Sequence, residues 1–325
     1  MVKLHEESGS PSGDRDRGSE LRAQFNSTRE DIERQVQATR QHLDEVNERI
    51  EAKAGRNLIA AIGIGLLVGG GVLLSLIFVK EIFLVAATAL IAAASVELAN
   101  AFRTAGRRID VIPLATGSVL VMLSGYLLAP EWRWGVLVVV LLALVLWRVL
   151  AARLGAEAGP ARLTDVTATV LVLVYISVLG SVAMTLLAQD GGQWWVLAFI
   201  ILVVSVDTGA YAAGVLLGRH PMAPRISPKK TWEGFAGAAV ASQIAGILVS
   251  VLMLGQSWVL GVVFGALILL TATMGDLGES LIKRDLGIKD MSSWFPGHGG
   301  ILDRLDSMLP SAPMAFGVFI VSTLL

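Results

Sequence analysis

The sequence predicts an all-α fold: a polytopic membrane helical bundle of about nine transmembrane helices, preceded by an N-terminal cytoplasmic helix. Three observations lead to this prediction. Hydrophobic residues make up 54% of the 325 residues, and the mean hydropathy is +0.67. Charged residues make up only 16%, whereas soluble domains contain about 25%. The apolar residues also fall into nine segments, each close to the ~20 residues that a membrane-spanning helix needs.

The first 56 residues are polar and predict two parts ahead of the membrane helices. Residues 1–20 are rich in Ser, Gly and charge and predict a disordered tail. Residues 21–56 predict a cytoplasmic helix, in which Ser27 and Glu30 have the spacing of a capping box. Apolar side chains recur there every three or four residues, which fits an amphipathic surface helix or a dimeric coiled coil. The sequence leaves these two interpretations open.

The nine apolar segments divide into N-terminal transmembrane helices over 57–190 and a C-terminal catalytic transmembrane domain over 191–325. The second and sixth segments each contain one acid, Glu97 and Asp207. An unpaired acid inside a membrane costs roughly 2.5–3.5 kcal/mol on insertion scales, so both should find a partner in the bundle interior. For Glu97, a structural hydrogen bond and a catalytic role both stay open. The expected segments are 58–79, 82–102, 111–129, 134–150, 166–188, 194–217, 233–254, 257–275 and 304–325.

Basic residues are sorted between the loops and so predict the orientation of the chain. The loops after even-numbered segments, with the adjoining segment ends, hold thirteen Lys and Arg residues, whereas the other loops hold only Lys80 and Arg133. By the positive-inside rule, the N-terminus is cytoplasmic and the C-terminus lies outside. Short loops and the absence of a transit peptide favour a bacterial inner (plasma) membrane. The chain contains no cysteine, which excludes disulfides and thiolate metal sites.

The densest group of charges lies late in the chain, over residues 275–306, between the last two apolar segments. Asp276, Glu279, Ser280 and Lys283 are spaced i, i+3, i+4 and i+7, so a helix places them on one face. A polar stripe that continues an apolar segment predicts a helix whose inner end faces a cavity. A solvated helix end would explain Lys283 equally well. It explains Asp276 poorly, because that acid directly follows an apolar run.

Asp303 and Asp306 lie at the start of the last apolar segment. Acids in a first helical turn complement the helix dipole, which is one explanation for them. The glycine pair just before them favours another, because glycines allow a tight turn and a close backbone approach to a ligand. The preceding loop is short enough to return Asp303 to Asp276. Since Mg²⁺ usually takes one or two carboxylates together with phosphate oxygens, we predict that Asp276 and Asp303 are metal ligands.

A third polar cluster covers residues 219–234, which contain three prolines and four Lys or Arg residues. It predicts a phosphate-binding loop, with an ordinary positive-inside loop as the alternative. Asp207 and Tyr211 share one helical face that leads towards it. No P-loop or dinucleotide-binding fingerprint is present in the sequence. Together the clusters predict phosphoryl or nucleotidyl transfer at the cytoplasmic membrane face, where the protein positions the reactants and neutralises charge.

The stretch SLIKRDLGIKDMSSWFPGHGGILDRLD, residues 280–306, resembles the signature of the phosphatidate cytidylyltransferase (CDP-diacylglycerol synthase) family, with no departure from it. The residues around Asp207 and over 227–234 also resemble patterns of that family. The resemblance implies transfer of the cytidylyl group of CTP to phosphatidic acid, giving CDP-diacylglycerol and pyrophosphate for phospholipid biosynthesis. It also implies a membrane-embedded, Mg²⁺-dependent homodimer, with K⁺ as the candidate second ion and no nucleic acid among its partners.

Carried over residue by residue, the resemblance implies two sets of site residues. The substrate-binding set is Asp207, Tyr211, Ser227, Lys229, Lys230, Thr231, His298, Gly299 and Gly300. The catalytic set is Asp276, Lys283, Arg284, Lys289, Asp290, Asp303, Arg304 and Asp306, in which the basic residues meet phosphates. Phosphate is already largely ionised near neutral pH, so neither His298 nor Asp306 is assigned as a general base.

Two other functions compete with this one. A CDP-alcohol phosphotransferase needs an Asp-Gly-x-x-Ala-Arg motif before its later aspartates, and none precedes Asp303 and Asp306 here. A transporter would use intramembrane acids to carry ions, and broken helices or inverted repeats would favour it. The sequence contains no convincing repeat. Protection by CTP that requires Mg²⁺ would distinguish the enzyme from a transporter.

Overall fold

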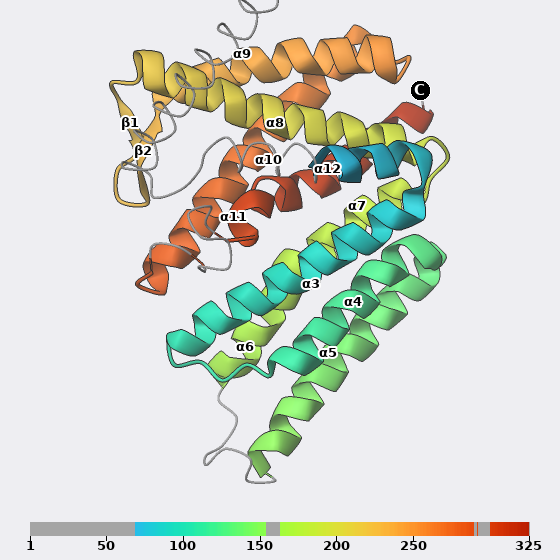
Figure 1. Cartoon of the computed structure of the whole chain (residues 1–325), viewed down its shortest axis with the longest axis vertical. Coiled ribbons are helices and arrows are strands. Elements are labelled where there is room, and N and C mark those ends of the chain that lie inside the picture. The colour runs from blue at the N-terminus through green and yellow to red at the C-terminus, as the bar shows by residue number, and fades with distance from the viewer. Residues whose placement is uncertain (1–68, 154–162, 289–290, 292–299, 325) are drawn as a thin grey trace, which may run out of the picture. The chain divides into compact units, whose positions relative to one another are not determined.

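The computed structural model describes residues 69–153, 163–288, 291 and 300–324 (Figure 1). The tail over 1–20 and the helix expected over 21–56 lie outside these residues. A helix over Gly69–Phe78 opens the described part. The elements that follow are α3 (Lys80–Thr104), α4 (Val111–Leu127), α5 (Pro130–Arg153), α6 (Leu163–Val172), the π-helical turn η1 (Leu173–Val178), α7 (Leu179–Leu187), α8 (Gly192–Leu217), β1 (Pro221–Ala223), β2 (Ser227–Thr231), α9 (Trp232–Leu248), the π-helical turn η2 (Val249–Met253), α10 (Trp258–Asp285), α11 (Leu302–Leu305) and α12 (Met308–Leu324).

Seven helical stretches in the described part are long and apolar enough to cross a membrane, with α6, η1 and α7 counting as one stretch. Each coincides with an expected segment, and two shorter apolar helices, Gly69–Phe78 and Val111–Leu127, lie within the other two. The predicted polytopic helical bundle is therefore confirmed, and the protein is an integral membrane protein. The eighth apolar segment is expected to end at residue 275, with its helix continued by the polar stripe. Helix α10 does continue to Asp285, and the stripe faces a cavity, so this prediction is confirmed.

Helices α3, α4 and α5 lie side by side, with α4 packed against both of the others (Figure 1). Three fully buried serines link α3 and α4 to η1: Ser95 on α3, Ser118 on α4 and Ser177 in η1. The hydroxyl oxygens of Ser118 and Ser177 are 2.8 Å apart, and those of Ser95 and Ser118 are 3.1 Å apart. Hydrogen bonds of this kind hold membrane helices together, because lipid offers no alternative partner.

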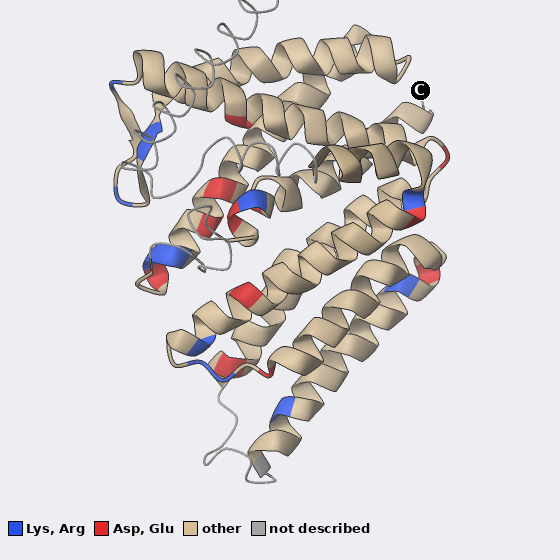
Figure 2. Ribbon diagram, viewed as in Figure 1, with Lys and Arg blue, Asp and Glu red and all other residues tan. Residues whose placement is uncertain are grey.

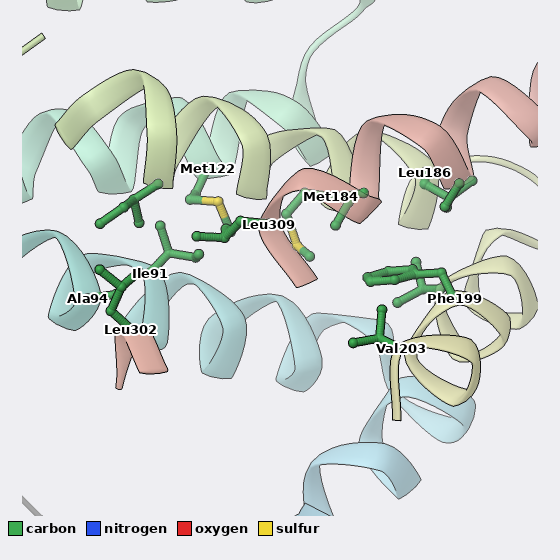
Figure 3. Packing of buried hydrophobic residues seen from close by; sticks show 14 of the residues in the cluster. Ile91, Ala94, Met122, Met184, Leu186, Phe199, Val203, Leu302 and Leu309 are labelled. Atoms are coloured by element: carbon green, nitrogen blue, oxygen red, sulfur yellow. The ribbon is translucent and has the colours of Figure 1, made fainter. Parts of the chain in front are cut away.

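Helix α12 packs against α7, α8 and α10 and so joins the earlier helices to the later ones. Figure 3 shows its Leu309 among Ile91 of α3, Met122 of α4 and Met184 of α7. Leu309, Met122 and Met184 are each at most 3% exposed. This apolar cluster positions the start of α12. The short helix α11, which contains Asp303, lies just before α12 in the chain.

Helices α8, α9 and α10 pack closely because glycines line their contacts. A Cβ added at Gly261 of α10 would lie 2.5 Å from the backbone oxygen of Gly246 on α9. Gly265 meets the backbone of Ser242 in the same way, with 2.6 Å to its oxygen. Small residues at such contacts let membrane helices approach closely. This packing matters for the site, since α8, α9 and α10 form three of its walls.

We expect Gly261→Val to lower the melting temperature in detergent, because the new side chain must push α9 and α10 apart. Overpacking of this kind costs about 1–3 kcal/mol. Gly135→Val on α5 is the matched control, since a Cβ there meets nothing within 4 Å. Thermal unfolding of both variants, followed by tryptophan fluorescence, measures the difference. Equal melting temperatures for the two variants would contradict the close contact.

Candidate functional site

A polar cavity of about 410 Å³ lies between α8, the β1–β2 hairpin, α9, α10, α11 and the two residues that join α11 to α12. Figure 2 shows acidic and basic residues gathered on α10, α11 and the hairpin, while most of each helix carries neither. Eight charged side chains line the cavity: Asp207, Lys229, Lys230, Asp276, Glu279, Lys283, Asp303 and Asp306. The predicted return of Asp303 to the neighbourhood of Asp276 is therefore confirmed.

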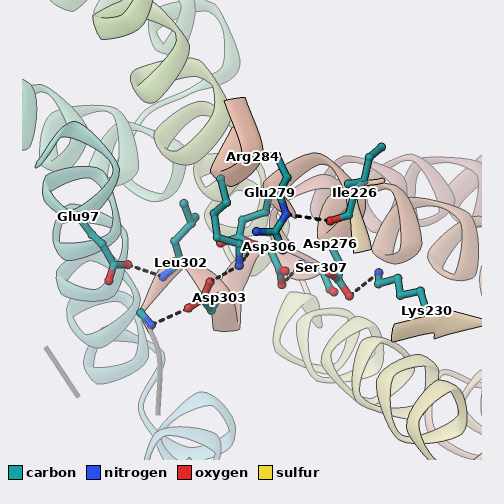
Figure 4. Close-up of polar contacts among 12 residues, drawn as sticks. Glu97, Ile226, Lys230, Asp276, Glu279, Arg284, Leu302, Asp303, Asp306 and Ser307 are labelled. Atoms are coloured by element: carbon teal, nitrogen blue, oxygen red, sulfur yellow. Dashed lines mark hydrogen bonds and ion pairs between the residues drawn. The ribbon is translucent and has the colours of Figure 1, made fainter. Parts of the chain in front are cut away.

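The hairpin carries Lys230 to the cavity. Its two antiparallel strands pair Pro221 with Thr231, and α9 begins directly after β2. Thr231 is the N-cap of α9, because its hydroxyl accepts a hydrogen bond from the backbone N–H of Gly234 at 3.1 Å. Lys230 is thereby held beside α10, where its Nζ lies 2.5 Å from Asp276 Oδ2 (Figure 4).

Lys283 lies between two carboxylates at the inner end of α10. Its Nζ is 2.6 Å from Glu279 Oε2 and 2.8 Å from Asp303 Oδ1. Glu279 is one helical turn before Lys283 and only 1% exposed, so the pair is largely withdrawn from water. A buried charge needs a close partner of opposite sign. Lys283 is therefore shared by the two acids, which fix its ammonium group at the cavity wall.

Three further acids face one another across the cavity. Asp207 of α8, Asp276 of α10 and Asp306 are close enough to repel one another, and Lys230 attracts both Asp207 and Asp306. Asp306 is 8% exposed, and its carboxylate accepts a hydrogen bond from the backbone N–H of Ser307 at 2.6 Å. Carboxylates gathered around few cations favour binding of additional positive charge.

Asp303 is also held by a backbone group of the segment just before it. The backbone N–H of Gly300 donates to Asp303 Oδ2 at 2.7 Å, while Lys283 bonds the other oxygen. Glu97 of α3 approaches the same segment, and its Oε2 accepts from the backbone N–H of Leu302 at 2.7 Å (Figure 4). Its carboxylate fills the space in which a Gly300 side chain would lie. Gly300 does not belong to the described glycines with positive φ, so its close contact with Glu97, not a left-handed turn, requires glycine.

The structure brings together most of the expected site residues. Nine of them line the cavity: Asp207, Tyr211, Lys229, Lys230, Thr231, Asp276, Lys283, Asp303 and Asp306. Four others lie outside the described residues: Lys289, Asp290, His298 and Gly299. Their assigned roles stay predictions.

Four expected residues in the described part of the chain do not line the cavity. Arg284 donates to the backbone oxygen of Ile226 at 3.3 Å and so ties α10 to the hairpin. Ser227 begins β2 opposite Ala223, and Gly300 lies against Glu97. Arg304 lines a second, apolar cavity of about 400 Å³ between α3, α7, α8 and α12. Direct contact of these four with a substrate stays a prediction.

Glu279 lines the cavity, although it is not among the site residues expected from the sequence. The signal was present, because Glu279 shares the polar stripe with Asp276 and Lys283. Its buried Oε1 has no hydrogen-bond partner in the described part of the chain. Ser307 and Thr273 also line the cavity, and no sequence signal distinguishes them from other hydroxyl residues in membrane helices.

The sequence of this chain is similar to those of known phosphatidate cytidylyltransferases. A phosphatidate cytidylyltransferase of Mycobacterium bovis is 39% identical over 284 residues, which cover 84% of this chain and 91% of that protein. The phosphatidate cytidylyltransferase of Mycobacterium leprae is 39% identical over 277 residues, 81% of this chain and 88% of that protein. The sequence profile of the cytidylyltransferase family matches residues 59–322, which include every described helix that lines the cavity. This chain therefore belongs to the cytidylyltransferase family.

Proposed function

We propose that this protein transfers the cytidylyl group of CTP to phosphatidic acid, releasing pyrophosphate and forming CDP-diacylglycerol for phospholipid biosynthesis. The names of the relatives support this reaction. The observation that carries the proposal is the polar cavity at one end of the membrane helix α10, where lysines lie among five carboxylates. Such a cavity suits a water-soluble nucleotide that must meet a lipid phosphate.

The reaction joins a phosphate oxygen of phosphatidic acid to the α-phosphorus of CTP and breaks the bond from that phosphorus to the departing pyrophosphate oxygen. Negative charge grows on the leaving group, and positive groups fixed in advance stabilise it. Lys283 is held by Glu279 and Asp303, and Lys230 is held by Asp276, so both ammonium groups are preorganised. The attacking phosphate is already ionised, so this mechanism uses no general base.

The cavity residues fit Mg²⁺, a hard cation that takes oxygen ligands. Glu279, whose buried Oε1 has no hydrogen-bond partner among the described residues, lines the same cavity as Asp276 and Asp303. Mg²⁺ usually takes one or two carboxylates and completes its shell with water and phosphate oxygens. We therefore propose Asp276 and Asp303 as the Mg²⁺ ligands, with K⁺ as the second ion; bound Mg²⁺ would neutralise phosphate charge.

An assay on the purified protein in detergent tests the reaction. Radiolabelled CTP and phosphatidic acid are incubated with Mg²⁺, with EDTA, or with choline in place of K⁺. We expect a chloroform-soluble cytidine product that requires both substrates and Mg²⁺ and that falls when K⁺ is removed. No lipid product from correctly folded protein would contradict the proposed reaction, and CTP-independent ion flux through reconstituted protein would favour the transporter.

For the orientation, we propose a cytoplasmic N-terminus and an external C-terminus in a bacterial inner membrane. The chain has no cysteine, so one cysteine appended after Leu325 gives an unambiguous label site. A membrane-impermeant maleimide should label it in spheroplasts before lysis. Labelling only after lysis would place the C-terminus in the cytoplasm and contradict the proposal.

The assembly we propose is the homodimer that the family resemblance implies. Light scattering of the detergent complex, corrected for bound detergent, should give twice the 34.4 kDa chain mass. A mass of one chain at assay concentrations would contradict it.

A further inference from the structure

Glu97 is a buried acid inside a membrane helix, and the proposed reaction gives it no role. It lies on α3 and is only 1% exposed. Its carboxylate bonds the backbone N–H of Leu302, which is 205 residues further along the chain. An acid inside a membrane is costly, so its placement needs a compensating interaction. Figure 4 shows that the interaction is with the segment that carries Asp303.

That segment is a single helical turn, α11, over Leu302–Leu305. The first N–H groups of a helix have no partner within the helix, and a membrane interior offers no water to satisfy them. Glu97 supplies a side-chain oxygen as the acceptor for the first residue of α11. The Leu302 side chain is fully buried, so the start of α11 is held by side-chain packing as well as by the hydrogen bond to Glu97.

The contact continues directly to the cavity. Asp303 follows Leu302, and its two oxygens bond Lys283 and the backbone N–H of Gly300. The Glu97 carboxylate lies beside Gly300 and bonds Leu302, so it contacts two residues of the turn that orients Asp303. A shift of α11 would therefore move Asp303 relative to Lys283, although Glu97 itself does not line the cavity.

We propose that Glu97 is a positioning residue: its carboxylate oxygens hold the start of α11 so that Asp303 and Lys283 keep their working geometry. The role depends on a hydrogen-bond acceptor of the right length at this position. The kinetic part of the test rests on the proposed cytidylyltransferase function, and the labelling part does not.

The kinetic test compares Glu97→Gln with Glu97→Leu. Gln keeps a carbonyl oxygen for the Leu302 N–H, whereas Leu keeps a similar volume without an acceptor. Small misplacements of reacting groups cost about 100-fold in rate, so Glu97→Leu should lower kcat by roughly 10- to 100-fold, with KM for CTP within about twofold of wild type. Glu97→Gln should keep kcat within about threefold of wild type. Retained kcat in Glu97→Leu, or an equal loss in Glu97→Gln, would overturn the proposal, as would a change confined to KM.

The labelling test needs no turnover. In this cysteine-free chain, Ile301→Cys places one thiol directly before α11, at a position that is 8% exposed. Adding Glu97→Leu should raise its rate of maleimide labelling at least about fivefold, because local opening of a segment exposes its buried groups. Ala315→Cys, fully buried on α12, is the control for general unfolding and should label at the same slow rate with and without Glu97→Leu. An unchanged labelling rate in the Ile301→Cys background, or equal acceleration in both cysteine backgrounds, would overturn the proposal.

The two readouts separate the possible failures. Wild-type protein that makes no lipid product defeats the proposed reaction, while the labelling comparison still tests the role of Glu97. Wild-type activity with an active Glu97→Leu variant defeats only the positioning role.

Discussion

Replacing Asp303 by Asn should reduce turnover by about 1,000-fold while the protein stays folded. The two Asp303 oxygens accept from Lys283 and from the Gly300 N–H, but an amide offers only one oxygen. One of these bonds is therefore lost, and the cavity loses a negative charge that the proposed Mg²⁺ ligation needs. Losses of 10²–10³-fold accompany removal of a single preorganised electrostatic group, and loss of a metal ligand adds to them. The measurement is kcat with CTP and phosphatidic acid at several Mg²⁺ concentrations.

Asp285→Asn is the matched control for this variant, because Asp285 ends α10 in the same charged stretch but is exposed and does not line the cavity. It should retain near wild-type turnover. If Asp303→Asn regains near-normal turnover at saturating Mg²⁺, or if both variants lose activity equally, Asp303 does not have the role we propose.

The second large effect is expected from Lys283→Met, in stability as well as in turnover. Without the ammonium group, Glu279 and Asp303 face each other with no shared cation, and Glu279 has almost no access to water. Breaking a buried ion pair by removing one partner costs roughly 3–5 kcal/mol. We expect a lower melting temperature together with a loss of turnover of at least about 100-fold.

The double variant Lys283→Met/Glu279→Gln separates these two effects. It removes the uncompensated buried charge, so the melting temperature should recover towards wild type. Turnover should stay low, because the cation at the cavity is still absent. Recovery of turnover in the double variant would show that Lys283 only maintains the fold.

Much of the fold could be predicted because apolar runs long enough to span a bilayer are recognisable in the sequence. The expected segments coincide with the observed helices, and the polar stripe from Asp276 to Lys283 correctly predicts a cavity face. The end of α10 could not be predicted from hydropathy alone, because a helix continues beyond the hydrocarbon wherever its polar face has a cavity to line. The pairing of Asp276 with Lys230 likewise depends on how the hairpin folds back.

The contacts of Glu97 and Arg304 depend on tertiary packing. Glu97 meets a backbone group 205 residues away, and no spacing rule connects two such positions. Arg304 follows Asp303 in the sequence, yet the two line different cavities, because successive side chains of a helix point in different directions. The sequence interprets Gly300 as allowing a tight turn and a close backbone approach to a ligand, whereas the group that approaches Gly300 in the structure is Glu97.

The fate of the two ends of the CTP triphosphate tests the central proposal most directly. Purified protein is incubated with phosphatidic acid, Mg²⁺ and CTP labelled with ³²P at either the α- or the γ-phosphate. Cytidylyl transfer predicts that the α-label enters the chloroform-soluble lipid and that the γ-label leaves as water-soluble pyrophosphate. Entry of the γ-label into lipid, with the α-label left on a water-soluble nucleotide, would show phosphoryl transfer instead and contradict the proposed function.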